Sequence, residues 1–198
     1  MKTNQQRIQT ITGIGLLSAI VFALQFVSMA IRFGTFSITL SLIPMVVGAA
    51  MYGAGAGAWL GFVFGLAVLI SGDASPFLAV NIAGTVITVL AKGMLSGFVS
   101  GLVYRLLEKK NGILAAVCAA ILSPVVNTGV FLIGCVLFFW DTISTWAMAL
   151  PQFGENVVAY MFVGLVGLNF IWELGVNLVF SQTLVNIIRI GKKRFSRQ

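Results

Sequence analysis

The sequence predicts an all-α integral membrane protein, and three observations carry that prediction. Of its 198 residues, 59% are hydrophobic and only 9% are charged, against about 25% charged residues in an ordinary soluble domain. The mean hydropathy is +1.05. Apolar residues extend along nearly the whole chain, more than one buried core of this size could hold, so lipid must cover much of the surface.

Six apolar stretches predict a bundle of six transmembrane helices within one membrane domain over 1–198. They cover 8–31, 38–52, 53–70, 78–107, 113–139 and 156–190. The first is longer than the apolar region of a signal peptide and no small-residue cleavage site follows it. The second contains Pro44 and is too short to cross a hydrocarbon core of about 30 Å, so it should be short, bent or partly embedded.

The predicted connections are polar turns and loops at 32–37, 71–77, 108–112 and 140–155. Two of them, 71–77 and 140–155, contain Asp73, Asp141 and Glu155, which we interpret as ordinary charges of exterior loops. Trp140 and Trp146 are well placed for an aromatic belt at the membrane interface. Short basic tails are expected at 1–7 and 191–198.

The distribution of cations predicts the orientation of the chain. Ten of the twelve Lys and Arg residues lie in three segments, 2–7, 105–110 and 189–197. Because cytoplasmic loops of membrane proteins are enriched in Lys and Arg, these segments and both termini should face the cytoplasm. The net charge of +7 therefore flanks hydrophobic spans and does not indicate binding to nucleic acid.

Several classes of chemistry are excluded by composition. The sequence has no histidine, and Cys118 and Cys135 lie in apolar runs and are interpreted as small core residues. No histidine cluster, CxxC pair or Ser-His-Asp triad can be assembled from this set, which excludes haem, zinc and triad-hydrolase chemistry, and we expect no cofactor or metal. The phosphate-binding pattern GxxxxGK[ST] is also missing, so the chain cannot hydrolyse nucleotide by that route.

Small residues recur at a spacing of four in three of the predicted helices, which places each set on one helix face. The sets are Gly53, Gly57, Gly61 and Gly65; Gly93, Gly97 and Gly101; and Gly15, Ala19 and Ala23. Such strips let another backbone approach closely. The two glycine sets indicate packing within the bundle, whereas the set in the first helix suits either internal packing or the docking of a partner.

Polar side chains within the spans are the candidate functional residues, because they are costly in lipid. Lys92 lies roughly 20 Å from the start of its span at 1.5 Å per residue. Asn169, Glu173 and Asn177 form a polar stripe on the last helix, and the fifth helix adds Asn127 with Thr128. Asn81, Thr85 and Thr88 lead along the fourth helix toward Lys92.

Three interpretations of these residues stay open. Lys92 and Glu173 could form a buried ion pair that holds two helices in register and contacts no ligand. Alternatively, a solute cavity lies between the fourth, fifth and sixth helices, where Lys92 receives a carboxylate and amides recognise hydroxyl or amide groups. A proton relay is the third, but it needs a chain of titratable groups that the sequence does not supply.

The segment from Ser37 to Gly65, SITLSLIPMVVGAAMYGAGAGAWLGFVFG, resembles the second and third helices of the substrate-binding S components of energy-coupling factor (ECF) vitamin transporters. The chain length, the six helices, the short second span and the Ala19-x-x-x-Ala23 element are similar as well. By this resemblance, Ala19 and Ala23, with Gly15 one turn earlier, dock on a membrane T component that joins two ATPase subunits.

The resemblance also implies a mechanism and a location. S components are multi-pass proteins of the bacterial plasma membrane that bind a vitamin from outside. They then topple in the bilayer on docking to the ATP-driven module and release the vitamin inside. The chain would thus be a transporter subunit and not an enzyme. The family's outward pocket among the fourth to sixth helices matches Asn81, Lys92, Asn127 and Asn169, with Glu173 deeper.

The overall similarity is greatest to the pantothenate type of S component. The sequence lacks the histidine and clustered tryptophans of the thiamine type and the acidic pattern of the riboflavin type. Pantothenate has one carboxylate, two hydroxyls and an amide, which one cation and several amides could bind. Folate or another small carboxylate-bearing vitamin remains an alternative, as do a structural or assembly role and a self-sufficient secondary carrier.

Overall fold

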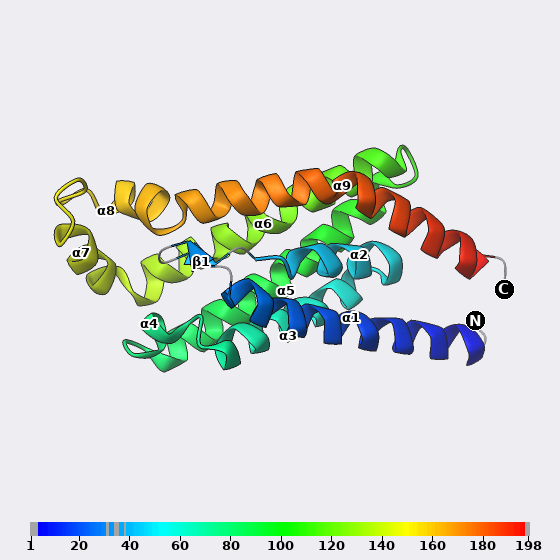
Figure 1. Ribbon diagram of the computed structural model, residues 1–198, viewed down its shortest axis with the longest axis horizontal. Helices are drawn as coiled ribbons and strands as arrows, with labels where there is room; N and C mark the ends of the chain where they lie inside the picture. Colours follow the sequence, from blue (N-terminus) through cyan, green and yellow to red (C-terminus); the bar gives the residue numbers. More distant parts are fainter. Residues whose placement is uncertain (1–3, 31, 34–35, 38, 197–198) are drawn as a thin grey trace.

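The computed structural model describes residues 4–30, 32–33, 36–37 and 39–196 and shows an elongated bundle of long helices (Figure 1). Lys2 and Arg197 lie outside the described residues. Four helices are long and apolar enough to span a membrane, a bent helix pair is a fifth candidate, and one apolar helix is shorter. The four long helices are α1 (Asn4–Ala30), α3 (Ala54–Ser71), α5 (Ile82–Leu107) and α6 (Gly112–Phe138). The bent pair consists of α8 and η1 followed by α9, and the shorter apolar helix is α2.

A hairpin precedes the second predicted span, and the span itself forms a short helix. Strands β1 (Arg32–Phe33) and β2 (Phe36–Ser37) pair antiparallel where a turn was predicted. Helix α2 (Leu42–Tyr52) follows, and its 11 residues extend for roughly 16 Å at 1.5 Å per residue, about half of a hydrocarbon core. Gly53 ends it with a φ of 98°, a conformation that glycine adopts at no steric cost. The prediction of a short second helix is confirmed.

Helices α3 and α5 pack backbone to backbone through their glycines. A Cβ atom on Gly61 would overlap the carbonyl oxygen of Gly93, and one on Gly57 would overlap that of Gly97. Only glycine allows this approach on both helices. The structure therefore shows the predicted internal packing for both glycine sets except at Gly53, where an added Cβ atom would meet nothing within 4 Å.

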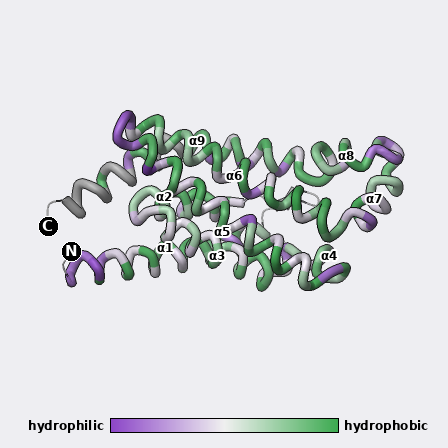
Figure 2. The backbone as a smooth tube through the Cα atoms, turned by 180° about the vertical axis from the view of Figure 1, so that it is seen from behind, coloured by the Kyte–Doolittle hydropathy of each residue, from purple (hydrophilic) through white to green (hydrophobic). Residues whose placement is uncertain are grey.

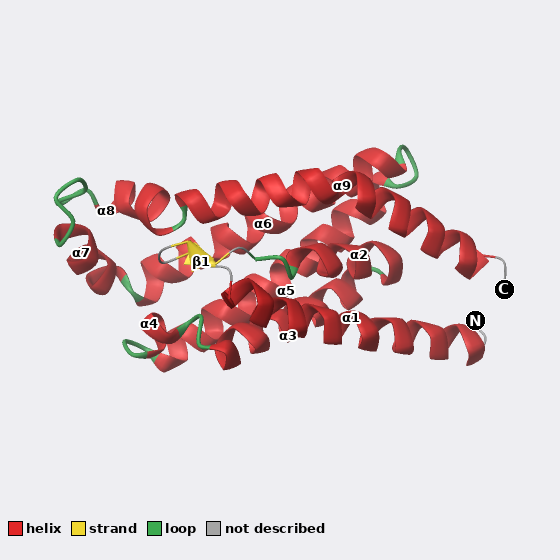
Figure 3. Cartoon of the chain, in the orientation of Figure 1, coloured by secondary structure: helices red, strands yellow, loops and turns green. Residues whose placement is uncertain are grey.

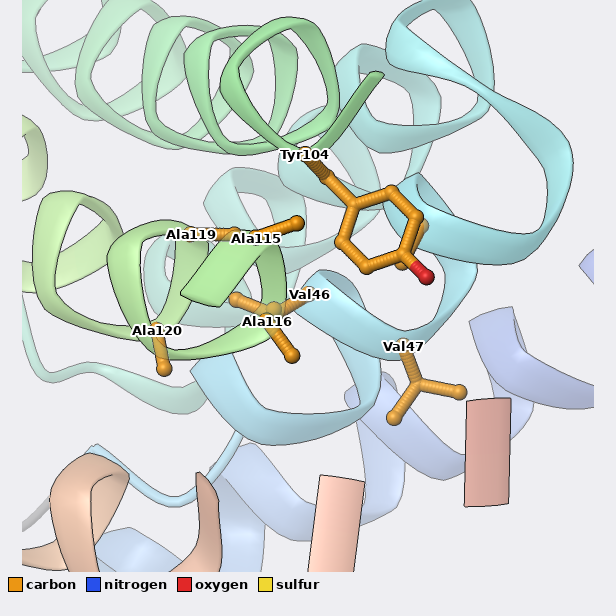
Figure 4. Close-up of a cluster of buried hydrophobic side chains, with 8 residues drawn as sticks. Val46, Val47, Tyr104, Ala115, Ala116, Ala119 and Ala120 are labelled. Atoms are coloured by element: carbon orange, nitrogen blue, oxygen red, sulfur yellow. The ribbon is translucent and has the colours of Figure 1, made fainter. Parts of the chain in front are cut away.

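A second region of close packing joins α2, α5 and α6 near the end of the bundle that holds the termini (Figure 4). Alanines on one face of α6 meet valines of α2, and the Tyr104 ring of α5 lies beside them. The buried members of this cluster are Val46, Val47, Ala50, Tyr104, Ala115, Ala116, Ala119 and Ala120. The small alanines let the short α2 insert between the longer helices.

Two predicted loops contain helices (Figure 3). The loop after α3 folds into α4 (Ser75–Leu78), and Pro76 suits its first turn because its missing N–H needs no partner there. The stretch predicted as a loop from Trp140 to Glu155 begins with α7 (Trp140–Met148). Both helices lie at the end of the bundle remote from the termini (Figure 1).

The last span is bent. It begins as α8 (Val157–Ala159), continues as the π-helix η1 (Tyr160–Leu165), breaks at Val166 and resumes as α9 (Gly167–Ser196). The two parts meet at an angle of 40°. Helix α9 runs on to Ser196, so the predicted tail from 191 begins as a continuation of this helix.

The N-terminus, the turn between α5 and α6 and the C-terminus lie at one end of the bundle, and α4 and α7 lie at the other (Figure 1). Hydrophilic segments gather at these two ends, with largely hydrophobic helices between them (Figure 2). This arrangement confirms the all-α membrane fold. The count of six spans with cytoplasmic termini stays a prediction.

Candidate functional site

A cavity of about 390 Å³ lies in the half of the bundle that contains α4 and α7. Its volume is near the lower end of the range of about 300–1,000 Å³ that is usual for small-molecule pockets. Helices α3, α4, α5, α6, α7 and α9 supply its wall, together with the segment before α2 and the bent part of the last span. The polar and charged lining residues are Thr39, Asp73, Thr85, Thr88, Lys92, Asn127, Thr128, Asn169 and Glu173.

Lys92 of α5 projects into this cavity between two aromatic rings. Its Nζ atom lies 5.2 Å from the centroid of Phe131 on α6 and 5.9 Å from that of Phe64 on α3. Ring faces stabilise a cation electrostatically without accepting its protons as hydrogen bonds. Glu173 and Asp73 are the acidic residues whose charges act on this ammonium group. Lys92 is thus held in place while its donors stay available.

Glu173 of α9 is 1% exposed and lies on the opposite wall. Its Oε1 atom accepts a hydrogen bond of 3.0 Å from Asn169 Nδ2, one turn earlier on the same helix. Its Oε2 atom has no hydrogen-bond partner. Within the described structure, neither carboxylate oxygen accepts a hydrogen bond from Lys92, so the direct structural pair is not formed.

Asn127 of α6 completes the polar part of the wall. It is 5% exposed, and its Oδ1 atom has no hydrogen-bond partner. Thr39, just before α2, and Asn127 both neighbour the Glu173 carboxyl group. Asn177, the last member of the predicted stripe, does not line the cavity; its Nδ2 donates to the Glu173 carbonyl oxygen at 2.8 Å.

The structure places Asn81 elsewhere. It is the residue that caps the N-terminus of α5, where its Oδ1 accepts from the Gly84 amide at 2.9 Å. It lines a separate surface groove with residues of α7 and does not line the cavity of Lys92. The predicted span began four residues too early, because Ser75–Leu78 form the separate helix α4.

The outer part of the cavity is aromatic, which was not predicted. The Phe77 ring of α4 makes edge-on contacts with Phe131, Phe139 and Trp146 at centroid distances of 5.4, 5.1 and 5.5 Å. Trp146 was interpreted as an interfacial residue and Asp73 as a loop charge, yet both line the cavity. The sequence contains no periodic signal that would bring residues of α4, α6, α7 and the α6–α7 junction together here.

The break in the last span lies at the cavity wall. Gly164, Leu165 and Val166, at the end of the π-helix and the bend, are all lining residues. π-Helical turns within helices occur frequently at functional sites, because they interrupt the regular hydrogen-bond ladder. The bend therefore helps to shape the outer part of the cavity.

The predicted docking residues do not line the cavity and lie on the exposed face of α1. A Cβ atom on Gly15 would have no protein atom within 4 Å, and Ala19 and Ala23 are exposed. In the described residues, no group of three or more His, Cys, Asp or Glu side chains is placed to hold a metal ion.

Comparisons with known proteins agree with this architecture. The family model described as "ECF transporter, substrate-specific component" matches residues 9–190. The fold is similar to that of ThiT from Listeria monocytogenes, with a TM-score of 0.66, 21% sequence identity, and coverage of 96% of this chain and 98% of that chain. No curated protein sequence matches the chain.

The family match covers nearly the whole chain and confirms the resemblance seen in the sequence, whereas the ThiT likeness bears on the fold alone. The chain therefore belongs to the substrate-specific components of ECF transporters, multi-pass proteins of the bacterial membrane that bind a small-molecule vitamin and work with a T component and ATPase subunits.

Proposed function

We propose that this S component binds a small carboxylate-bearing vitamin of the pantothenate type. The observation that carries the proposal is the Lys92 ammonium group, which faces a cavity from within a membrane-length helix. A cation in such a place is costly unless an anion compensates it, and functional sites are where such residues occur.

The surroundings of Lys92 favour a ligand over a structural role. Aromatic rings flank its Nζ atom, and neither oxygen of Glu173 accepts a hydrogen bond from it. A carboxylate of the ligand would complete a charge-assisted hydrogen bond, which is roughly twice as strong as a neutral one. Asn127, Asn169 and Glu173 provide polar groups for the hydroxyl and amide functions that pantothenate carries in addition.

The structural or assembly alternative predicts a cavity filled with side chains. The cavity of about 390 Å³ instead gives a small vitamin room between polar and aromatic walls. Folate stays a candidate, because it combines carboxylates with several polar groups, and a binding experiment must separate it from pantothenate.

The direct test is thermal unfolding of the detergent-purified chain with pantothenate and with folate. A ligand at 100 times its dissociation constant stabilises the folded state by roughly 2.7 kcal/mol. We expect pantothenate to raise the unfolding temperature of the wild-type chain. Lys92→Met should weaken its affinity by about 10-fold to 100-fold, because a hydrogen bond to a charged group is lost.

Arg105→Met is the matched control, since it removes a charge from the same helix at the exposed end remote from the cavity. It should leave the affinity unchanged. Unchanged affinity in Lys92→Met would contradict the proposed role of Lys92. If folate alone raises the unfolding temperature, folate and not pantothenate is the substrate. If neither vitamin raises it, both substrate assignments are contradicted.

The proposal includes docking on a T component through α1, followed by toppling to release the vitamin inside. The exposed strip of Gly15, Ala19 and Ala23 supports it, because small side chains allow a partner helix to approach the α1 backbone. Only 11% of the most apolar window of α1 is buried within the chain, so most of that helix is open to lipid or a partner.

A further inference from the structure

Unpartnered oxygens occur on three of the helices that line the cavity. Six buried side-chain oxygens in the described residues have no hydrogen-bond partner, and four of them belong to cavity-lining residues. These four are Thr88 Oγ1, Asn127 Oδ1, Asn169 Oδ1 and Glu173 Oε2. Buried polar groups in folded proteins are nearly always hydrogen-bonded, so such a cluster needs an explanation.

Two of these atoms can be identified as hydrogen-bond acceptors, one from its neighbour and one from the chemistry of its own group. Asn169 donates through Nδ2 to Glu173 Oε1 at 3.0 Å, which orients the amide so that its other terminal atom is the oxygen. The second atom is a carboxylate oxygen, and an ionised carboxylate can only accept. Asn169 Oδ1 can therefore only accept, and Glu173 Oε2 accepts when its carboxyl group is ionised; both belong to cavity-lining residues, so a ligand donor in the cavity can supply the missing hydrogen bonds.

The four residues come from three helices and line the same cavity. Thr88 precedes Lys92 by one turn on α5, Asn127 lies on α6, and Asn169 and Glu173 are one turn apart on α9. Thr88, Asn127 and Glu173 are 4%, 5% and 1% exposed. They are well shielded from bulk water, so the cost of leaving them unpaired is high.

We propose that the cavity selects substrates that have at least two hydroxyl or N–H donors in addition to an anionic group. The donors bind the four oxygens, which we call the acceptor cluster, while the anion faces Lys92. This inference rests on the proposed function and makes it more specific. It predicts that a carboxylate alone is insufficient for binding.

The proposal divides carboxylate vitamins into two classes. Pantothenate has two hydroxyls and one amide N–H, biotin has two ureido N–H groups, and folate has several N–H donors. Nicotinate and lipoate have a carboxylate but no further O–H or N–H donor. We expect binding only within the first class, because a site that hydrogen-bonds donors strongly rejects a ligand that leaves its buried polar groups unpaired.

The first arm of the test measures the affinity of the purified full chain for these five compounds. Glu173→Gln keeps the size of the side chain but replaces a carboxylate oxygen by an NH₂ group, which opposes a ligand donor. It should weaken binding of any donor-bearing ligand by about 10-fold to 100-fold. Thr88→Val should weaken it by roughly threefold to tenfold.

Two control variants remove similar groups outside the cavity. Ser100→Ala deletes a buried hydroxyl on the same helix as Thr88, one that already donates to the Ser96 carbonyl oxygen at 2.7 Å. Asn177→Leu removes a buried amide of α9 that does not line the cavity. Both should leave ligand affinity unchanged, whatever they do to the stability of the fold.

The second arm needs no ligand and compares unfolding temperatures of the ligand-free chain. Replacing an unpartnered buried polar group by an apolar group of the same shape is neutral or stabilising. Thr88→Val should therefore unfold at the wild-type temperature or above it. Thr85→Val should unfold at a lower temperature, because the Thr85 hydroxyl donates to the Asn81 carbonyl oxygen at 2.7 Å.

The outcomes separate this inference from the proposed substrate. If biotin or folate binds and Glu173→Gln weakens that binding, the acceptor cluster is supported although pantothenate is not the substrate. Binding of nicotinate or lipoate as tight as that of the donor-bearing compounds, or unchanged affinity in Glu173→Gln, overturns the inference. If no compound binds, a lower unfolding temperature of Thr88→Val overturns it and an unchanged or higher one supports it.

Water can supply the same donors as a vitamin, and the affinity arm distinguishes these two sources. If the acceptor cluster only held permanent water, Glu173→Gln and Thr88→Val would leave ligand affinity unchanged. That result counts against the inference, because the cluster would then have no part in selecting the substrate.

Discussion

Two strips of small residues at the same spacing have opposite surroundings in this molecule. On α3, Gly57 and Gly61 face the backbone of α5 so closely that a single Cβ atom would overlap a carbonyl oxygen. On α1, Gly15 has open space around it, and Ala19 and Ala23 are exposed. In its most apolar window, 44% of α3 is buried but only 11% of α1.

The difference shows what small-residue spacing can and cannot indicate. It predicts that another backbone is able to approach a helix face, because no side chain stands in the way. It does not predict whether that backbone belongs to the same chain. The strip on α3 packs against α5 within the molecule, whereas the strip on α1 is exposed on the outside of the bundle.

The largest expected effect is that of a methyl group placed in the α3–α5 contact. Gly61→Ala should destabilise the isolated chain by about 1–3 kcal/mol, because the new Cβ meets the rigid Gly93 backbone and the helices must separate. Thermal unfolding in detergent measures the change. Gly55→Ala on the same helix meets nothing within 4 Å and should be neutral or slightly stabilising.

If Gly61→Ala and Gly55→Ala unfold at the same temperature, the stability of the chain does not depend on the close contact between α3 and α5. The strip on α3 would then differ from the strip on α1 in its surroundings but not in its effect on stability.

The second effect concerns association with the T component. Ala19→Leu should weaken co-purification with the T component and ATPase pair by about tenfold, or about 1.4 kcal/mol, because the larger side chain holds a partner helix away. Its unfolding temperature and vitamin affinity should match the wild type, since Ala19 is exposed. Leu16→Ala, on a neighbouring exposed position of α1, is the control.

Loss of stability in isolated Ala19→Leu would show that the strip packs within the chain. Full association of the variant would remove it as the docking surface.

The smallest effect tests how firmly α1 is held to α3. Trp59 Nε1 donates to Ser18 Oγ at 3.3 Å, an exposed hydrogen bond between the two helices. Trp59→Phe should lower stability by about 0.5 kcal/mol, at the low end for a hydrogen bond. Careful chemical denaturation can measure this change in the free energy of unfolding. A loss of several kcal/mol would mean that α1 is held to α3 as tightly as α5 is held to α3 at the glycine contact.

Much of the candidate site could be predicted from single residues, for a physical reason. Lys92 and Glu173 stand out because a charged side chain in an apolar span is expensive and rare. Asn127 and Asn169 stand out for a related reason. Each of these residues does line the cavity. Asn81 has the same chemical character but caps α5, because the boundary between α4 and α5 was not visible in the sequence.

The aromatic part of the site could not be predicted in the same way. Phe77, Phe139 and Trp146 are ordinary residues for a chain with this composition, and Phe77 is distant in the sequence from the other two. Their meeting depends on α4 and α7, two short helices within stretches that read as loops. Short helices have weak sequence signals, since their formation depends on tertiary contacts.

The sequence by itself determined that the chain lies in a membrane, that its helices can pack closely, and which buried side chains are costly enough to mark a site. These properties follow from hydropathy and spacing, which are local. Only the tertiary structure decided that Lys92 and Glu173 face a shared cavity without forming a pair, that Asn81 is a cap, and that one small-residue strip is filled while the other is open. Those outcomes depend on which helices become neighbours, and the pattern within a single helix does not contain that information.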